Sequence, residues 1–266
     1  MTDSTTQRQE DLRRIEAALR EAETALAPFT PGAIAVERKA GGDPVTEADQ
    51  RVDDVLRRLL PQAGEGWLSE ETVDDQVRLD KQRAWVVDPL DGTREFVEGI
   101  PQWSVSIGLV EEGQPVAGGV LNPATQQLVL GAIGHGVTLN GEPARVSTRE
   151  TLEGAVVLAS NSEIRRGEWQ RFEDHGIVVR PCGSVAYKLA LVAAGLVDAT
   201  WTLVPKNEWD VVAGVALVRA AGGIIEPKNE PGRTFNRPSP LLEGLLAFPP
   251  QLEQSIRDLI GSTGGL

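Results

Sequence analysis

Histidine and cysteine are scarce in this chain of 266 residues. It has two histidines, His135 and His175, and one cysteine, Cys182. A single cysteine forms no internal disulfide, so nothing in the sequence indicates an oxidising compartment. The segment between His175 and Cys182 is predicted to be extended, roughly 23 Å at full stretch. The sequence therefore argues against a paired cysteine nucleophile, and Cys182 is expected to be a small buried residue.

Net positive charge and long apolar runs are also lacking. The chain has 26 Lys and Arg against 39 Asp and Glu, a net charge of −13. Polymeric nucleic acid and anionic lipid both need a basic surface, so neither partner is expected. No apolar run approaches about 18 residues, and the N-terminus lacks a signal-peptide core. We therefore expect a cytoplasmic protein without a membrane partner. Binding of a small phosphate stays open, because metal ions can neutralise clustered carboxylates locally.

Three common catalytic motifs are absent as well. The Walker loop, His-Glu-x-x-His and Gly-x-Ser-x-Gly do not occur. Nucleoside triphosphatase, zinc protease and serine hydrolase activities therefore lack support.

The spacing of apolar residues predicts a mixed α/β fold. Helices are expected over 12–26 and 47–59, followed by strands at 84–87, 103–110, 115–121 and 127–133. After residue 150 short strands alternate with helices, which are expected over 163–175, 184–194, 210–221 and 252–260. This order favours layered sheets with helices outside and between them. We place a division between an N-terminal half, 1–148, and a C-terminal half, 149–266.

The segment 85–96, Trp-Val-Val-Asp-Pro-Leu-Asp-Gly-Thr-Arg-Glu-Phe, concentrates polar groups after an apolar strand. The proline after Asp88 ends the strand ladder, because it has no N–H. The glycine after Asp91 permits a tight turn, and Thr93 then opens the next segment with free N–H groups. Both carboxylates and the Leu90 carbonyl can converge on one hard cation. An ordinary turn with capping acids is the alternative interpretation.

Three further acidic positions add to this segment. Glu70 follows an apolar residue in Ser-Glu-Glu, Asp210 heads the predicted helix 210–221, and Asp49 follows Thr46 at the start of the second helix. Each has an ordinary explanation, as a solvated loop acid or as a helix cap. Four such positions in one chain favour a shared role in binding metal.

Together these motifs resemble the signatures of the inositol monophosphatase superfamily. The resemblance rests on Asp-Pro-Leu-Asp-Gly-Thr at 88–93, Ser-Glu-Glu at 69–71 and Trp-Asp at 209–210. Lys39 and the segment 44–49 resemble the N-terminal loop and helix of that family. The match is collinear from about residue 36 to 225. It implies a layered α/β/α/β/α fold and hydrolysis of small phosphate monoesters that depends on two or three Mg²⁺ ions and is inhibited by Li⁺.

The resemblance also assigns residue roles. The implied Mg²⁺ ligands are Glu70, Asp88, the Leu90 carbonyl, Asp91 and Asp210. The implied catalytic residues are Asp49, Thr93 and Glu70, the first two as activators of the attacking water. The implied phosphate and substrate contacts are Gly92, Thr93, Gly183, Ser184, Lys39, Arg94 and Lys206. Metal ions lower the pKa of bound water, which explains how such a site works without histidine.

The substrate is the open question. Inositol enzymes typically have an acid where this chain has Leu203, and they read Thr-Asn where it has Arg94-Glu95. Both features lean away from inositol phosphates. The segments 43–46, 69–71 and 205–210 resemble those of bacterial 3'(2'),5'-bisphosphate nucleotidases, which convert phosphoadenosine phosphate to adenosine monophosphate. A pocket containing Leu203 would suit a base better than a polyol. Arg94 and Lys206 could bind a second phosphate of the substrate. The alternative interpretation is that both are solvated cations on the surface.

Other segments favour a different branch. Residues 99–106 and 139–141 resemble inositol-1-monophosphatases, so that activity is the alternative. A non-catalytic metal-binding regulatory protein of the same fold would have at least one broken ligand position, and none is broken here. We predict a bisphosphate nucleotidase acting on a small phosphorylated metabolite. Homodimers and monomers both occur among such enzymes, and the sequence leaves the two open.

Overall fold

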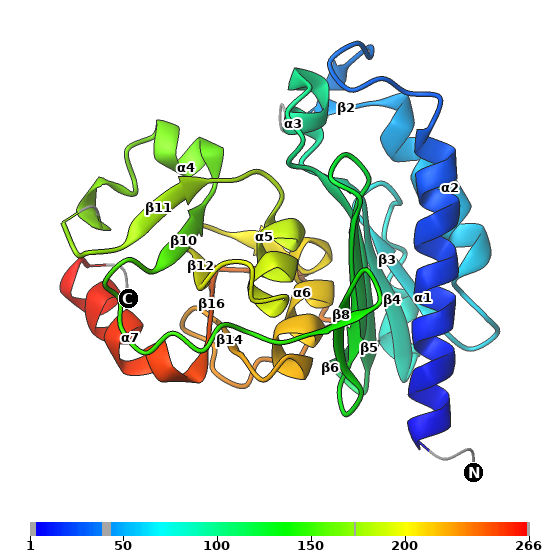
Figure 1. Ribbon diagram of the computed structural model, residues 1–266. Helices are drawn as coiled ribbons and strands as arrows, with labels where there is room; N and C mark the ends of the chain where they lie inside the picture. The colour runs from blue at the N-terminus through cyan, green and yellow to red at the C-terminus, as the bar shows by residue number, and fades with distance from the viewer. Residues whose placement is uncertain (1–3, 39–43, 173, 265–266) are drawn as a thin grey trace.

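The computed structural model describes residues 4–38, 44–172 and 174–264. Helices and sheets alternate in five layers, which confirms the predicted α/β/α/β/α architecture (Figure 1). None of the described helices is long and apolar enough to cross a membrane.

A seven-stranded sheet forms the larger half of the fold. Its strands follow one another in chain order, antiparallel except for the first pair. The strands are β3 Gly66–Ser69, β4 Arg83–Asp91, β5 Ser104–Glu111, β6 Gln114–Asn122, β7 Gln127–Ala132, β8 Gly136–Leu139 and β9 Glu142–Ala144. Helices α1 (Ser4–Leu26) and α2 (Glu47–Leu59) cover one face (Figure 1). The apolar stripe predicted from the sequence is the buried side of α1.

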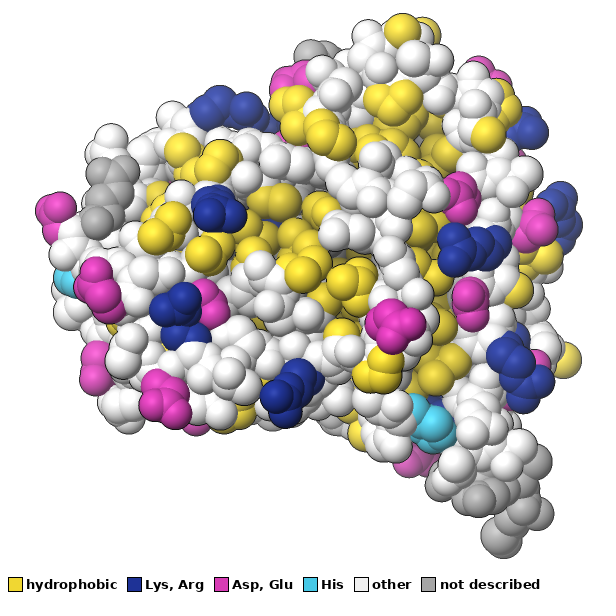
Figure 2. All heavy atoms as spheres, viewed as in Figure 1, with side chains coloured by type: hydrophobic (Ala, Val, Ile, Leu, Met, Phe, Trp, Pro, Cys, Tyr) yellow, Lys and Arg dark blue, Asp and Glu magenta, His cyan; other side chains and the backbone are white. Residues whose placement is uncertain are grey.

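Two helices fill the centre of the molecule. α5 (Val185–Ala193) and α6 (Glu208–Ala220) lie against the other face of the seven-stranded sheet (Figure 1). Glycine permits this contact, since a Cβ on Gly108 would lie 2.5 Å from Val212 Cγ1. On the face shown in Figure 2, apolar side chains gather over this central layer, and charged side chains are scattered around it.

A five-stranded sheet lies on the far side of the central helices, in the order β11-β10-β12-β16-β14. Its strands are β10 Val156–Ala159, β11 Val178–Pro181, β12 Ala199–Thr202, β14 Ile224–Pro227 and β16 Leu245–Phe248. The outer layer holds α4 (Asn161–Arg165) and α7 (Glu253–Ser262) (Figure 1). The central layer packs on both sheets, so the division at residues 148/149 stays a prediction.

Short elements complete the fold. These are α3 Thr93–Glu98, the pair β1 Glu37–Arg38 and β2 Pro44–Val45, the pair β13 Lys206–Asn207 and β15 Leu241–Leu242, and the 3₁₀ turns Val77–Asp80, Gln170–Phe172 and Pro250–Leu252. The predicted helix over 163–175 is wrong. Over the described residues of this range only the end of α4 and the second 3₁₀ turn are helical, because the chain turns at Gly167 with φ of +77°.

Candidate active site

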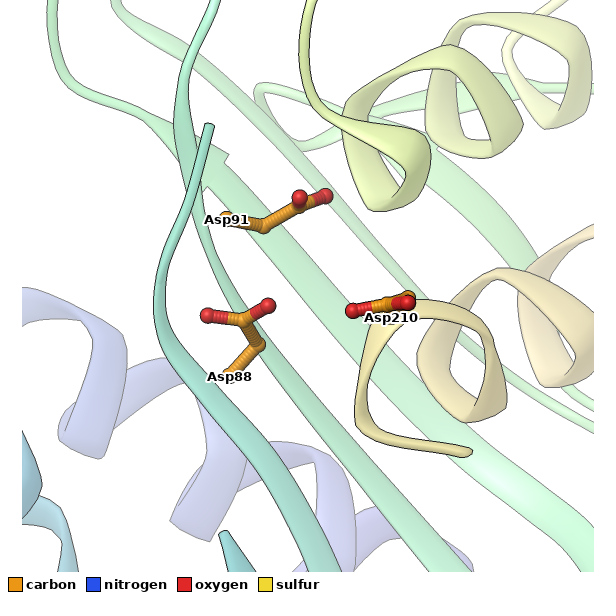
Figure 3. Close-up of side chains that lie close together, drawn as sticks. All are labelled: Asp88, Asp91 and Asp210. Atoms are coloured by element: carbon orange, nitrogen blue, oxygen red, sulfur yellow. The ribbon is translucent and has the colours of Figure 1, made fainter. Parts of the chain in front are cut away.

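Three aspartates from distant parts of the sequence converge between the sheet and the central helices. Asp88 and Asp91 come from the end of β4, and Asp210 comes from the first turn of α6 (Figure 3). One carboxylate oxygen of each lies within 4.8 Å of the others. Oxygen ligands at this spacing suit a hard divalent cation such as Mg²⁺. The geometry therefore brings together three of the predicted ligands.

An irregularity in β4 turns both of its aspartates toward one space. The pairing with β5 shifts register between Asp88 and Asp91. The Leu90 N–H donates to Asp88 Oδ1 over 3.0 Å, which closes the turn. The next residue, Gly92, has φ of +93°, and a Cβ there would lie 2.9 Å from the Gln102 carbonyl oxygen. Only glycine fits this conformation and this space.

Donors at the starts of α5 and α6 hold the other two carboxylates. Asp91 Oδ2 accepts from the Ser184 hydroxyl at 2.7 Å and from the Ala186 N–H at 2.6 Å, both at the start of α5. Asp210 Oδ2 accepts from the Asn207 N–H at 2.9 Å in a capping box of α6. Among the hydrogen bonds of the described residues, Oδ1 of both side chains stays without a donor. Each aspartate is thus fixed by one oxygen and can offer the other to a cation.

The cluster is electrostatically strained without a cation. Burial, followed by repulsion from neighbouring carboxylates that include Glu70, raises the pKa of Asp88 well above its ordinary value. Burial raises the Asp91 pKa to about 6, although the bonds from Ser184 and Ala186 oppose it. Burial and the Asp91 charge raise the Asp210 pKa to about 8. A divalent cation would neutralise the cluster, so the donor set fits the implied metal.

Glu70 lies beside the three aspartates on a braced loop. It lines the same cavity, and its charge contributes to the raised pKa values of the aspartates. The preceding residue, Ser69, donates its hydroxyl to buried Asp53, and the Thr72 hydroxyl donates to the same side chain at 2.6 Å. Asp53 therefore fixes the loop that carries Glu70, a role that sequence analysis missed.

Thr93 and Asp49 meet as the resemblance implies. The Thr93 hydroxyl lies 2.9 Å from Asp49 Oδ1 and 3.0 Å from the Leu90 carbonyl oxygen. The other Asp49 oxygen accepts from the Thr46 N–H and hydroxyl, at 2.8 and 2.6 Å, in the predicted capping box of α2. Burial raises the pKa of Asp49. The carboxyl is thus locked in place beside the Thr93 hydroxyl.

A polar cavity of about 310 Å³ opens at this cluster. The predicted site residues that line it are Glu70, Asp88, Leu90, Asp91, Gly92, Thr93, Arg94, Gly183, Ser184, Lys206 and Asp210. Lys39 lies outside the described residues, so its contact with the substrate stays a prediction. Leu203 is not among the lining residues and packs instead on the core around Trp201 and Phe248. The pocket argument based on Leu203 is therefore wrong, because its side chain faces the core.

Several cavity residues carry no sequence motif. Missed by sequence analysis, they are Ser160, Asn161, Ser162 and Arg165. All four lie between the end of β10 and the end of α4, and the end of a strand before polar residues was their only signal. Glu95, which the sequence analysis used only to compare substrate branches, lines the cavity as well. Asn161 donates to Glu95 Oε1 at 2.8 Å and to Gln102 Oε1 at 3.1 Å, which links α4 to the segment between β4 and β5. The same Gln102 oxygen accepts from the Gly183 N–H at 2.9 Å.

The layered fold and the carboxylate cluster in a polar cavity define the class, a metal-dependent phosphatase. The sequence profile of the inositol monophosphatase family matches residues 8–258. The chain therefore belongs to the inositol monophosphatase family and is a phosphoric monoester hydrolase.

Individual relatives agree with this assignment. An inositol-1-monophosphatase of Mesorhizobium japonicum is 38% identical over 203 residues, 72% of this chain and 75% of the relative. The Thermotoga maritima IMPase structure superposes with a TM-score of 0.81 at 28% identity, covering 96% of this chain and 97% of that one. CysQ of Bacteroides thetaiotaomicron superposes with a TM-score of 0.75 at 25% identity, covering 91% and 97%.

Proposed function

We propose that the chain is a Mg²⁺-dependent phosphatase whose preferred substrates carry a second phosphate. The leading candidate is a 3'(2'),5'-bisphosphate nucleotide, such as phosphoadenosine phosphate, which would yield adenosine monophosphate. One observation carries this proposal: three cationic side chains, Arg94, Arg165 and Lys206, line the cavity that holds the aspartates. A monoester with one phosphate needs fewer cations, since bound metal ions already neutralise the transferred group.

The acidic residues have distinct proposed roles. The residues that would hold two or three Mg²⁺ ions are Glu70, Asp88, the Leu90 carbonyl, Asp91 and Asp210. When bound, the ions would supply positive charge to the phosphate oxygens and activate the attacking water. The Thr93 hydroxyl can give its proton to Asp49 in a hydrogen bond, and its lone pairs then accept one from that water. Backbone N–H groups of Gly92 and Thr93 would face the phosphate.

An inositol-1-monophosphatase is the second candidate. The relative that is 38% identical carries this name. The cavity also offers amide and carboxylate groups, in Asn161 and Glu95, that could pair with ring hydroxyls. A non-catalytic regulatory role has less support, because no implied ligand position is lost. Cytoplasmic location stays a prediction from the sequence, which favours neither the monomer nor the homodimer.

Phosphate release with Mg²⁺ would separate the candidates. Phosphoadenosine phosphate and inositol 1-phosphate would be compared side by side, with Asp88→Asn as the blank. We expect the nucleotide to have the higher kcat/KM. Preference for the inositol ester would favour the second candidate, and cleavage of neither above the blank would show that the substrate class is wrong.

A pair of neighbouring arginines provides a matched control. Arg165 lines the cavity, whereas Arg166 is paired with Glu168 and does not line it. Arg165→Ala should raise the KM for the bisphosphate about tenfold, the value of one lost charge-assisted contact. The same change should leave the KM for inositol 1-phosphate within twofold. Arg166→Ala should change neither value. Equal effects of both variants would contradict a second phosphate site.

A further inference from the structure

Ser160 lines the cavity, and its side chain does not form the hydrogen bond expected at its position. It follows β10 and precedes the first residue of α4, where a serine normally caps the helix by accepting from a backbone N–H. Here the side chain makes no capping bond. Its oxygen instead accepts a hydrogen bond from Lys188 Nζ. The serine is therefore turned away from the helix that it would cap.

Lys188 is a buried cation on α5. It is 2% exposed, and burial lowers its pKa while the charge of Glu163 opposes that effect. Glu163 is also 2% exposed, and its carboxylate accepts from the Trp169 indole N–H at 3.0 Å and from the Thr202 hydroxyl. Burying an ammonium group is costly, and the nearby carboxylate only partly compensates. Ser160 Oγ is thus the acceptor that holds the ammonium, and the charge of Glu163 favours the charged form of the lysine.

The direction of this hydrogen bond fixes what the serine can do. A lysine ammonium has three donors and no acceptor, so Ser160 Oγ must accept. The proton of the serine hydroxyl must then point elsewhere. The hydrogen bonds of the described residues offer this proton no protein acceptor, and Ser160 lines the cavity. The hydroxyl is therefore set as a donor toward the bound substrate.

We propose that Ser160 is a substrate-binding residue that donates a hydrogen bond to an oxygen of the leaving group, and that Lys188 is the positioning residue that keeps it a donor. The inference rests on the proposed function and narrows the substrate class. The leaving group must carry an acceptor oxygen, from a hydroxyl or a second phosphate, in addition to the ester oxygen. Asn161 and Arg165, which line the same wall, would lie beside that oxygen.

Steady-state kinetics of four variants of the full chain would test this role. Ser160→Ala removes the donor, Lys188→Met removes the group that orients it, and the double variant removes both. Thr200→Val is the matched control, because its hydroxyl donates to the Leu158 carbonyl at 2.9 Å and does not line the cavity. Thermal unfolding of each variant would show which of them are folded.

Removing a contact with the leaving group that is equally strong before and during the reaction raises KM and leaves kcat unchanged. We expect about tenfold higher KM for Ser160→Ala on phosphoadenosine phosphate, the effect of one lost hydrogen bond, with kcat within twofold. Lys188→Met should also raise the KM for phosphoadenosine phosphate. The double variant should be no worse than Ser160→Ala, because both changes remove one interaction. Thr200→Val should match the wild type in KM.

Four results would overturn the inference. An unchanged KM in Ser160→Ala would remove the substrate contact. A fall in kcat at constant KM would place the hydroxyl at the reacting atoms instead. Additive effects of the two changes, or a Lys188→Met variant with lower thermal stability and unchanged KM, would remove the positioning role.

Failure of the proposed function would look different. In that case the wild type itself would release no phosphate above Asp88→Asn. Calorimetry would then measure the dissociation constant of adenosine monophosphate for the wild type and for Ser160→Ala. This comparison tests the hydrogen bond from Ser160 without requiring turnover. A tenfold weaker complex in the variant would support the contact, and equal constants would overturn it.

Discussion

Replacing a metal ligand should stabilise this protein when metal is absent. Asp210 is the clearest case, because burial and neighbouring carboxylates raise its pKa from 3.8 to about 8. The folded protein then holds a proton between pH 3.8 and about 8 that the unfolded chain has lost. Stability therefore falls as the pH rises through this window, and the full cost is present above it. Asp210→Asn removes the charge and keeps an oxygen to accept from the Asn207 N–H.

The magnitude follows from the size of the pKa change. A rise of this size corresponds to about 6 kcal/mol if it is realised in full, at about 1.4 kcal/mol for each pKa unit. The side chain is only partly buried, and water screens part of the repulsion. We therefore expect Asp210→Asn to raise the free energy of unfolding by about 2 kcal/mol at pH 9 with a chelator present. The gain should shrink steadily as the pH falls toward 4.

Urea unfolding at pH 9 and pH 5, with EDTA or with saturating Mg²⁺, would measure this effect. Mg²⁺ should reverse the order, since the wild type gains binding free energy that the variant has lost. Asp258→Asn, in an exposed acid of α7, changes net charge equally outside the cavity and should show neither effect. If Asp210→Asn is no more stable than the wild type at pH 9 in EDTA, the electrostatic strain assigned to the cluster is wrong.

Three further outcomes are expected. Gly183→Ala should lower kcat/KM at least tenfold in a phosphate-release assay, because its Cβ would lie 2.5 Å from the Glu95 side chain and must displace the cavity wall; unchanged kinetics would contradict this packing. Asp53→Ala should lower the free energy of unfolding by about 2 kcal/mol in urea titrations and weaken Mg²⁺ binding measured by calorimetry, since two hydroxyls near Glu70 lose their acceptor; retained metal affinity would refute the bracing role. Cys182 is buried and its pKa is raised to about 11, so native protein should resist iodoacetamide at pH 7.5, and mass spectrometry showing rapid alkylation would count against that environment.

Site residues could be predicted from the sequence where their positions depend on neighbours within a few residues. The turn residues around Asp88 and the cap at Thr46 predict where carboxylates face the end of an element, and the structure has them there. Asp210 is expected to head its helix and lies in the first turn of α6, in a capping box with Asn207. These patterns involve neighbours within three or four residues, so they can be recognised without the fold.

Features that depend on distant packing could not be predicted. Ser160 gains its role from Lys188, which lies 28 residues further along the chain on another element. Leu203 follows a strand, and only the packing of that sheet decides that it faces the core instead of the cavity. The helix expected over 163–175 fails for a related reason. Glycine breaks it, and Trp169 packs against Trp201 with ring centroids 4.9 Å apart.

Phosphate release as a function of Mg²⁺ concentration, for wild type and Asp88→Asn, tests the central claim most directly. The wild type should hydrolyse a phosphate monoester only with Mg²⁺ present, and the variant should lose at least a hundredfold in rate, because one buried ligand of the cluster is gone. Hydrolysis that persists in EDTA, or an Asp88→Asn variant with the wild-type rate, would contradict the assignment of this cluster as the catalytic metal site.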